Sequence, residues 1–415
     1  MRETSEFNIW KIRAEFPMLE QKMHGKPLVY LDSAATTQKP REVIHTLTRF
    51  YSEQYATVHR SVYEFASQAT ARYDDVRIQV KEFLGAAFAE EIVFTKGTTD
   101  GINLVANSFG RAFMQPGDEV IISVMEHHSN IVPWQLLCQE RGLRLKFIPI
   151  NARGELLLDE YEKLLTDRTK IVSVAHVSNV TGTINPVEEI IQMAHQRGAK
   201  VLIDGAQSIA HMPVDVQALG ADFYVFSGHK AYGPTGVGVL YGKRALLDKM
   251  PPYQGGGDMI DQVTLEGVTF EQAPLKFEAG TPAIAQVMGL GEALNFIESI
   301  GRDRIAAWEQ DLLEYAMEKM HQIPGLRIHG TAAKKSGIIT FNIDHLHPLD
   351  IGTLLDIRGI AIRTGHLCAQ PTLRCFNVNA TARISFGVHT TFEEIDLFLA
   401  ALQEVTLLLK PSLSY

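Results

Sequence analysis

Residues 223 to 230 read Phe223-Tyr224-Val225-Phe226-Ser227-Gly228-His229-Lys230. The four apolar residues are typical of a strand that is buried on both faces of a mostly parallel sheet. Polar residues follow directly where this strand would end. Since open parallel sheets bind their ligands at the carboxyl ends of the strands, we expect Ser227, His229 and Lys230 to lie in a ligand site.

Similar apolar runs recur on both sides of this stretch, and helix-like segments separate several of them. The runs are 92–94, 120–124, 145–150, 171–177, 201–203, 223–226 and 237–241. Their alternation with helices predicts a doubly wound α/β domain with a mostly parallel sheet. The last third mixes short strand candidates with helical patterns, which indicates a second, α+β domain. A chain of 415 residues also exceeds what one hydrophobic core usually holds.

The composition narrows the class of function. The formal net charge is −9 and no Lys/Arg-rich tract stands out, which argues against a nucleic-acid or polybasic membrane partner. The apolar runs are far shorter than the roughly 20 residues of a membrane-spanning helix. The N-terminus lacks an apolar signal core, so a cytoplasmic location is expected. Three cysteines provide no disulfide framework, and no Cys/His cluster has metal-ligand spacing, so no metal is expected.

The lysine after the strand is the first candidate for chemistry. A lysine in this place can form a Schiff base with an aldehyde cofactor, although Lys230 alone would more often be a solvated surface residue. Asp204 ends the apolar run 201–203 and is suited to keep a pyridinium nitrogen protonated, while Gln207 can reach a ring hydroxyl. The competing interpretation of Asp204 is a helix N-cap.

Two further strand ends carry polar groups. The segment 95–100 opens into a helix through Thr98 and Thr99, whose N–H groups and hydroxyls can cradle a phosphate. Helix capping by threonine is the plainer interpretation, and it is compatible with the first. His127 and His128 follow another apolar run, and one of them can stack on an aromatic cofactor and shuttle protons. Adjacent histidines point in different directions, so only one is expected to do so.

A loop bounded by glycine and proline contains Cys368, with Arg363 and His366 nearby to favour its thiolate. We interpret this thiol as a mobile nucleophile. Cys138 lies in an apolar helical context and is expected to be inert packing. The role of Cys375 stays open.

Together these segments resemble the class V aminotransferase-like pyridoxal-phosphate enzymes, and within them the SufS/CsdA group of cysteine desulfurases, also described as selenocysteine lyases. The resemblance extends from about residue 30 to the C-terminus. It rests on motifs that occur in the family's order: Tyr30-Leu31-Asp32-Ser33-Ala34-Ala35-Thr36, His59-Arg60, Glu126-His127-His128, Ser178-Asn179, Asp204-Gly205-Ala206-Gln207, Ser227-Gly228-His229-Lys230, Glu278-Ala279-Gly280-Thr281-Pro282 and Arg363-Thr364-Gly365-His366-Leu367-Cys368-Ala369-Gln370-Pro371.

The resemblance implies a fold and its divisions. The fold would be the pyridoxal-phosphate-dependent transferase fold (fold type I). An N-terminal segment, 1–29, would pack with the small domain. A large cofactor-binding domain would span 30–290, and a small C-terminal domain, 291–415, would carry the nucleophile loop.

The resemblance also implies a place for each candidate residue around pyridoxal phosphate. Lys230 would hold the cofactor, Asp204 would pair with its pyridine nitrogen and His127 would stack on its ring. The other cofactor ligands would be Gln207 at the ring hydroxyl, Thr98, Thr99, Ser227 and His229 at the phosphate, and Thr281, which would reach the phosphate across the interface of a homodimer. The substrate would be bound by Arg383, Asn179, Arg363, His59, Arg60 and Ala34, with Arg383 pairing with its carboxylate.

The implied reaction is that of a cysteine desulfurase. Lys230 would remove the Cα proton of L-cysteine, and Cys368 would attack the substrate sulfur, giving a Cys368 persulfide and L-alanine. The sulfur would then pass to an acceptor protein for iron–sulfur cluster assembly. L-Selenocysteine is a second substrate that the resemblance allows.

Two positions depart from the family pattern. Relatives commonly carry two histidines before the cysteine, but here the second is Leu367, so His366 is the local candidate for a proton relay. Relatives that pass sulfur to a zinc-bearing SufU-type acceptor tend to have histidine where this chain has Leu349. Since Leu349 cannot bind zinc, a SufE-type acceptor with its own thiol is expected.

Two other functions stay open on these residues. Another class V enzyme, such as an aminotransferase or a kynureninase-like hydrolase, would share Lys230 and Asp204 but would not need Cys368. A scaffold without pyridoxal phosphate in a sulfur-transfer assembly would not need Lys230, Asp204 and Gln207 intact.

Overall fold

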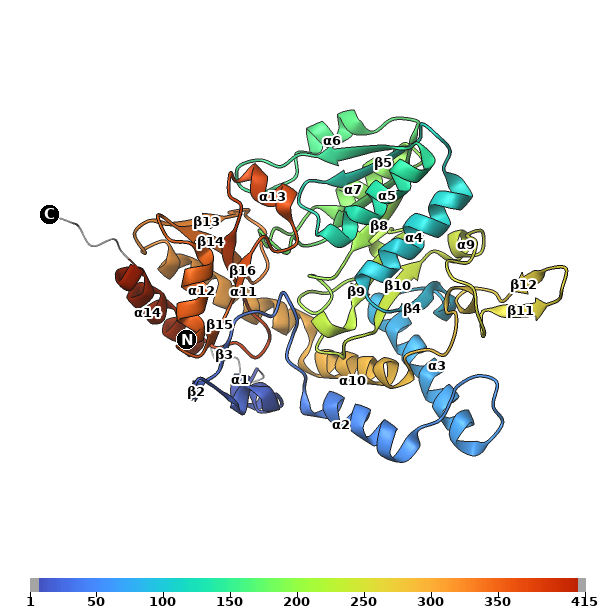
Figure 1. Ribbon diagram of the computed structural model, residues 1–415, viewed down its shortest axis with the longest axis horizontal. Helices are drawn as coiled ribbons and strands as arrows, with labels where there is room; N and C mark the ends of the chain where they lie inside the picture. The colour runs from blue at the N-terminus through green and yellow to red at the C-terminus, as the bar shows by residue number, and fades with distance from the viewer. Residues whose placement is uncertain (1–6, 410–415) are drawn as a thin grey trace.

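The computed structural model describes residues 7–409. Its centre is a seven-stranded sheet in the order β4-β10-β9-β8-β7-β5-β6 (Figure 1). β10 is antiparallel to both of its neighbours, and the other strands run parallel. The predicted mostly parallel α/β sheet is therefore confirmed. The strands are β4 (Ile92–Thr95), β5 (Glu119–Ser123), β6 (Arg144–Ile148), β7 (Thr169–Ala175), β8 (Lys200–Asp204), β9 (Phe223–Ser227) and β10 (Gly238–Gly242).

Alternate residues of the central strands enter two different hydrophobic cores. In β8, Val201 and Ile203 lie in one core and Leu202 lies in the other, and Tyr224 and Val225 of β9 divide in the same way. Because helices cover both faces, these strands are apolar throughout and do not alternate with polar residues. The first core includes α3 (Glu64–Leu84), α7 (Val187–Gln196) and α10 (Ile284–Ile300), and the second includes α4 (Thr98–Phe113) and α5 (Val132–Arg141).

The C-terminal part contains a second, antiparallel sheet in the order β13-β14-β17-β16. Its helices pack on the sheet through a third hydrophobic core, which includes Leu312, Ile351, Phe398 and the strand residue Ile339. The predicted α+β character of this part is confirmed. Its elements are α11 (Arg302–Met320), β13 (Leu326–His329), β14 (Ile338–Ile343), α12 (Pro348–Asp356), β16 (Arg363–Gly365), β17 (Thr381–Ser385) and α14 (Phe392–Leu409).

The N-terminal segment lies against this C-terminal part (Figure 1). β3 (Val29–Tyr30) pairs in parallel with β15 (Ile360–Ala361). Arg13, at the end of α1 (Ile9–Arg13), forms an ion pair of 2.8 Å with Glu394 of α14. These contacts join the two ends of the described chain, while the predicted domain boundaries stay a prediction.

Nine further α-helices and β-strands complete the described chain. They are β1 (Lys22–Met23), β2 (Lys26–Pro27), α2 (Arg41–Arg49), α6 (Leu158–Leu164), α8 (Val216–Leu219), α9 (Arg244–Leu247), β11 (Ile260–Val263), β12 (Val268–Phe270) and α13 (Gln370–Cys375). Between residues 7 and 409, no helix is long and apolar enough to cross a membrane. The same stretch holds no group of three or more His, Cys, Asp or Glu side chains placed to bind a metal ion.

Candidate active site

The carboxyl ends of the central strands border a cavity of about 290 Å³. Asp204 ends β8 and Ser227 ends β9, while Arg363, Arg383 and Cys368 reach the cavity from the C-terminal part. The site therefore lies between the two sheets. The predicted residues that line the cavity are Ala34, Thr98, Thr99, His127, Asn179, Asp204, Gln207, Ser227, His229, Lys230, Arg363, Cys368 and Arg383.

Lys230 and Asp204 lie at or just beyond the ends of neighbouring strands, and the charge of each affects the pKa of the other. Burial lowers the pKa of Lys230 to about 8, against the attraction of Asp204. Burial also raises the pKa of Asp204, against a hydrogen bond of 2.9 Å from the Ala206 N–H and the charge of Lys230. A neutral amine is the nucleophile that an aldehyde requires, and a lysine with a lowered pKa supplies it near neutral pH.

The backbone beside Lys230 is held by an unusual set of donors. The carbonyl oxygen of His229 accepts hydrogen bonds from the Thr37 N–H and from the hydroxyls of Thr36 and Thr37, each at 3.1 Å. Lys39 Nζ donates to the same oxygen at 2.9 Å, and burial lowers the pKa of Lys39 to about 7. These contacts fix the peptide that carries Lys230. No sequence pattern pointed to Lys39, because its partner is a backbone atom 190 residues away in the chain.

A phosphate cradle lies at the start of α4. The Thr98 N–H donates to Ser227 Oγ at 2.8 Å, and the two hydroxyl oxygens are also 2.8 Å apart. Gly97 has a φ of +152°, and a Cβ at Gly238 would lie 2.4 Å from Gly97 Cα. Glycine at both positions therefore lets β10 approach the start of the helix closely. Hydroxyls gathered at a helix N-terminus suit a phosphate group.

His127 presents a neutral ring to the cavity. Burial, together with the charge of Lys230, lowers its pKa to about 3. Its Nδ1 accepts the N–H of Ser129 at 3.1 Å, which leaves the proton on Nε2. An uncharged imidazole can stack on an aromatic ring without the desolvation cost of a cation.

Two arginines converge on Asp32. Its carboxylate lies 3.2 Å from Arg383 Nη2 and 2.7 Å from Arg363 Nη2. Arg383 also donates to the Asn179 carbonyl at 2.9 Å, but within residues 7–409 its buried Nε has no hydrogen-bond partner. A buried guanidinium with an unused donor beside a cavity suits a carboxylate ligand. The sequence placed Asp32 in a motif without assigning it a role.

The loop that carries Cys368 is held in a constrained conformation. Leu367 and Cys368 have left-handed backbone, with φ values of +54° and +53°; this conformation costs a residue other than glycine roughly 1–2 kcal/mol. Asn179 Nδ2 donates to the Leu367 carbonyl at 2.8 Å, and the His128 N–H donates to the Cys368 carbonyl at 2.8 Å. The thiol is exposed and lines the cavity.

His128 takes part in the site through this loop. Its Nε2 accepts the N–H of Gln370 at 3.4 Å, and its ring centroid is 5.8 Å from that of His366. His366 Nδ1 in turn accepts the N–H of Cys368 at 3.1 Å. The adjacent histidines do point in different directions: His127 lines the cavity, and His128 holds the loop.

Leu367 anchors the same loop by packing. Its side chain is 8% exposed and forms a small apolar cluster with Val180, Ala369 and Leu373. This chain therefore makes an apolar contact at the position where the family resemblance led us to expect a second histidine. Leu367 therefore holds the cysteine in place and cannot relay protons.

Three predicted residues lie outside the residues that line the cavity. The His59 ring packs edge-on against Tyr73, with centroids 5.6 Å apart, and Arg60 Nε lies 3.7 Å from Asp258 Oδ1. Thr281 is exposed. The roles given to His59, Arg60 and Thr281 stay predictions.

The donor set of the cavity fits pyridoxal phosphate. The buried Asp204 suits a pyridine nitrogen, Lys230 suits the aldehyde, and the start of α4 suits the phosphate. Gln207 Nε2 donates to the Ala34 carbonyl at 2.7 Å, so its amide is fixed at the edge of the cavity.

Comparisons with known proteins agree with this site. The Aminotransferase class-V family matches residues 29–398. A cysteine desulfurase of Serratia proteamaculans is 51% identical over 404 residues, which cover 97% of this chain and 99% of that protein. A probable cysteine desulfurase of Mycolicibacterium paratuberculosis is 51% identical over 97% of this chain, but this chain spans only 59% of that protein.

A solved structure supports the same relationship. The crystal structure of the cysteine desulfurase CsdA (S-sulfonic acid) from Escherichia coli matches with a TM-score of 0.91 at 41% sequence identity. The match covers 97% of this chain and 99% of that chain.

Truncating Leu367 should loosen the nucleophile loop. Loss of a buried leucine side chain removes roughly 2–3 kcal/mol of packing. We therefore expect Leu367→Ala to speed amide hydrogen exchange in residues 366–376 roughly 10- to 100-fold, as measured by mass spectrometry. Leu349→Ala is the matched control, because Leu349 is 59% exposed. Equal exchange in both variants would contradict the anchoring role.

Proposed function

Because this chain belongs to the class-V aminotransferase family, we propose that it is a cysteine desulfurase, which converts L-cysteine to L-alanine and captures the sulfur as a persulfide on Cys368. The single observation that carries the proposal is that an exposed thiol lines the same cavity as Lys230 and Arg383. An aminotransferase of this fold would have no use for a thiol held there.

The residues that would hold pyridoxal phosphate are Lys230, Asp204, Gln207, His127, Thr98, Thr99, Ser227 and His229. When bound, the cofactor draws electrons away from the Cα of the amino-acid substrate. Asp204 would keep the ring nitrogen protonated, and the neutral His127 would lie on the ring face. Thr98 and Ser227 share one hydroxyl network, which would hold the phosphate at the start of α4.

The substrate would be oriented by its carboxylate. Arg383 has an unused donor at Nε, and Asn179 holds both the Arg383 guanidinium and the Leu367 carbonyl. A carboxylate bound at Arg383 would therefore place the rest of L-cysteine beside the nucleophile loop. Arg363, which already pairs with Asp32, would raise the local positive charge.

The bond changes would be made by Lys230 and Cys368. With its lowered pKa, the Lys230 amine is suited to take the Cα proton. The Cys368 thiolate would then attack the substrate sulfur, so that an S–S bond forms and the substrate Cβ–S bond breaks. The electron pair of the broken bond stays with the three-carbon fragment, which takes up one proton at Cβ, regains one at Cα from the Lys230 ammonium, and leaves as L-alanine.

A homodimer is part of this proposal. Thr281 is exposed and lies outside the cavity of its own chain, as expected for a residue that serves a partner's cofactor. The hairpin of β11 and β12 also exposes apolar side chains, among them Leu265 and Val263. Sedimentation equilibrium should give twice the mass of the chain; a monomer at micromolar concentration would contradict the proposal.

We further propose a thiol-bearing SufE-type protein as the sulfur acceptor, with iron–sulfur cluster assembly as the destination. Leu349 is exposed and offers no zinc ligand, and His347 Nδ1 already accepts the Leu349 N–H at 3.2 Å. Turnover with L-cysteine should rise with a thiol acceptor protein and not with a zinc-bearing scaffold. The reverse result would contradict this proposal.

Three free cysteines in the described chain fit a reducing compartment, so we propose a cytoplasmic location.

The activity itself is tested by replacing Cys368. Purified protein with pyridoxal phosphate, L-cysteine and a reductant should release alanine and sulfide in equal amounts. Cys368→Ala should lower this activity at least about 100-fold, because without the thiol no persulfide can form on the protein. Cys375→Ala is the matched control and should keep full activity, since Cys375 does not line the cavity.

The outcomes separate the alternatives. Full activity in Cys368→Ala with a keto-acid acceptor and no sulfide would identify an aminotransferase. Activity of Cys368→Ala with L-selenocysteine alone would favour a selenocysteine lyase. A colourless protein that does not take up pyridoxal phosphate would favour a scaffold.

A further inference from the structure

Arg363 and Arg383 lie directly opposite each other on the neighbouring antiparallel strands β16 and β17. Both side chains line the active-site cavity. Like charges directly opposite each other across a strand pair are destabilising. Burial strengthens this repulsion, because the Arg383 side chain is only 4% exposed and little water screens its charge. The two arginines therefore need an anion beside them.

Asp32 supplies this anion from a third segment of the chain. The Ser385 N–H donates to the Leu31 carbonyl at 2.9 Å, which fixes the backbone next to Asp32 beside the end of β17. One carboxylate oxygen of Asp32, Oδ2, lies 2.7 Å from Arg363 Nη2, and the other, Oδ1, lies 3.2 Å from Arg383 Nη2. Asp32 does not line the cavity, so it acts on a ligand through the two guanidinium groups.

The charges at this end of the cavity match a ligand with one carboxylate. Arg363 and Arg383 carry two positive charges, and Asp32 offsets one of them. L-Cysteine has one carboxylate and a neutral side chain. An amino acid with a second carboxylate would have to pair with Arg363, whose guanidinium Asp32 already holds, and it would be repelled by Asp32.

We propose that Asp32 is a positioning residue that sets the substrate charge of this site: by pairing with both arginines, it leaves Arg383 to a single substrate carboxylate and keeps Arg363 from binding a second one. Without Asp32, Arg363 becomes a site for a second carboxylate, since its side chain is 48% exposed and lines the cavity. This role rests on the proposed function, in which Arg383 binds the carboxylate of an amino acid.

L-Aspartate and L-asparagine test this role, because they have nearly the same shape and differ in one negative charge. Each is titrated into the cofactor-loaded full-length protein without L-cysteine, and binding is followed by the change in visible absorbance. Asp32→Asn should raise the affinity for L-aspartate relative to L-asparagine roughly tenfold, because Arg363 gains a charged partner. The double variant Asp32→Asn/Arg363→Gln should return this ratio to the wild-type value, since it removes the charge that Asp32 offset.

Arg363→Gln alone keeps Asp32 and should shift the ratio the other way, roughly threefold against L-aspartate. This variant tests the charge balance even if Asp32→Asn does not fold. The matched control is Asp344→Asn, which removes a carboxylate 2.9 Å from Arg327 and outside the cavity lining. It should leave the ratio unchanged.

An unchanged ratio in Asp32→Asn and in Arg363→Gln, or no return in the double variant, would overturn the role and leave Asp32 as a structural counter-ion. Failure of the proposed function gives a different result. If Cys368→Ala still releases sulfide, the desulfurase mechanism is wrong, but the ratio of the two affinities still reports on Asp32. If the unsubstituted protein binds neither amino acid, both proposals are overturned.

Discussion

The carbonyl oxygen of His229 joins the two halves of the active site. Thr36, Thr37 and Lys39, from the N-terminal part of the chain, donate to it at the carboxyl end of β9. A few residues earlier on the same segment, Asp32 pairs with both Arg363 and Arg383 of the small sheet. The segment 32–39 therefore holds the backbone of the reactive lysine and the carboxylate-binding arginines in one frame. If this segment moved, the cofactor end and the substrate end of the cavity would separate.

Burial gives the site its reactivity. Removing charged groups from water disfavours their charged forms, and the cavity shows this effect on groups of both signs. The pKa of Lys230 falls to about 8 and that of His127 to about 3, while the pKa of Asp204 rises. Burial also lowers the pKa of Arg383, and the neighbouring Asp32 carboxylate opposes this shift. The result is a pocket that combines a nucleophilic amine, a neutral ring and a buried anion-binding guanidinium.

Much of this arrangement could be predicted from the sequence. The apolar runs predicted the mostly parallel sheet, and residues placed after the runs, such as Asp204 and Lys230, do lie at one cavity. The class-V family, the fold class and the pyridoxal-phosphate cofactor are confirmed. The strands could be predicted because both faces of the sheet are buried, so that each strand is a continuous apolar run in the sequence.

The missed residues act through contacts that sequence patterns do not encode. Lys39 and His128 form hydrogen bonds with backbone atoms 190 or more residues away in the chain. Because every residue has a backbone carbonyl, the sequence cannot show which one is the partner. From the sequence, Leu367 meant that one histidine of a possible proton relay was missing. In the structure its side chain packs against Val180 and Leu373, and this apolar contact can offset the strain of the left-handed backbone at Leu367 and Cys368.

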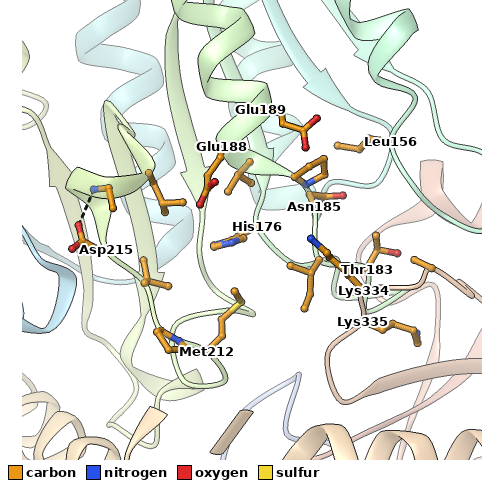
Figure 2. A pocket seen from close by; sticks show the side chains of 18 of the residues that line it. Leu156, His176, Thr183, Asn185, Glu188, Glu189, Met212, Asp215, Lys334 and Lys335 are labelled. Carbon is orange, nitrogen blue, oxygen red and sulfur yellow. Dashed lines mark hydrogen bonds between the residues drawn. The ribbon is translucent and has the colours of Figure 1, made fainter. Parts of the chain in front are cut away.

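A second cavity, of about 1170 Å³, lies on the other side of the end of β7 from the active site (Figure 2). Ala175 and Val177 line the active site, and His176 between them lines the second cavity, so one short piece of backbone borders both. Asn185 Nδ2 donates to the Ala175 carbonyl at 2.8 Å and so fixes this backbone from the side of the second cavity. Loss of the Asn185 amide must therefore affect the active site, because Ala175 lines it.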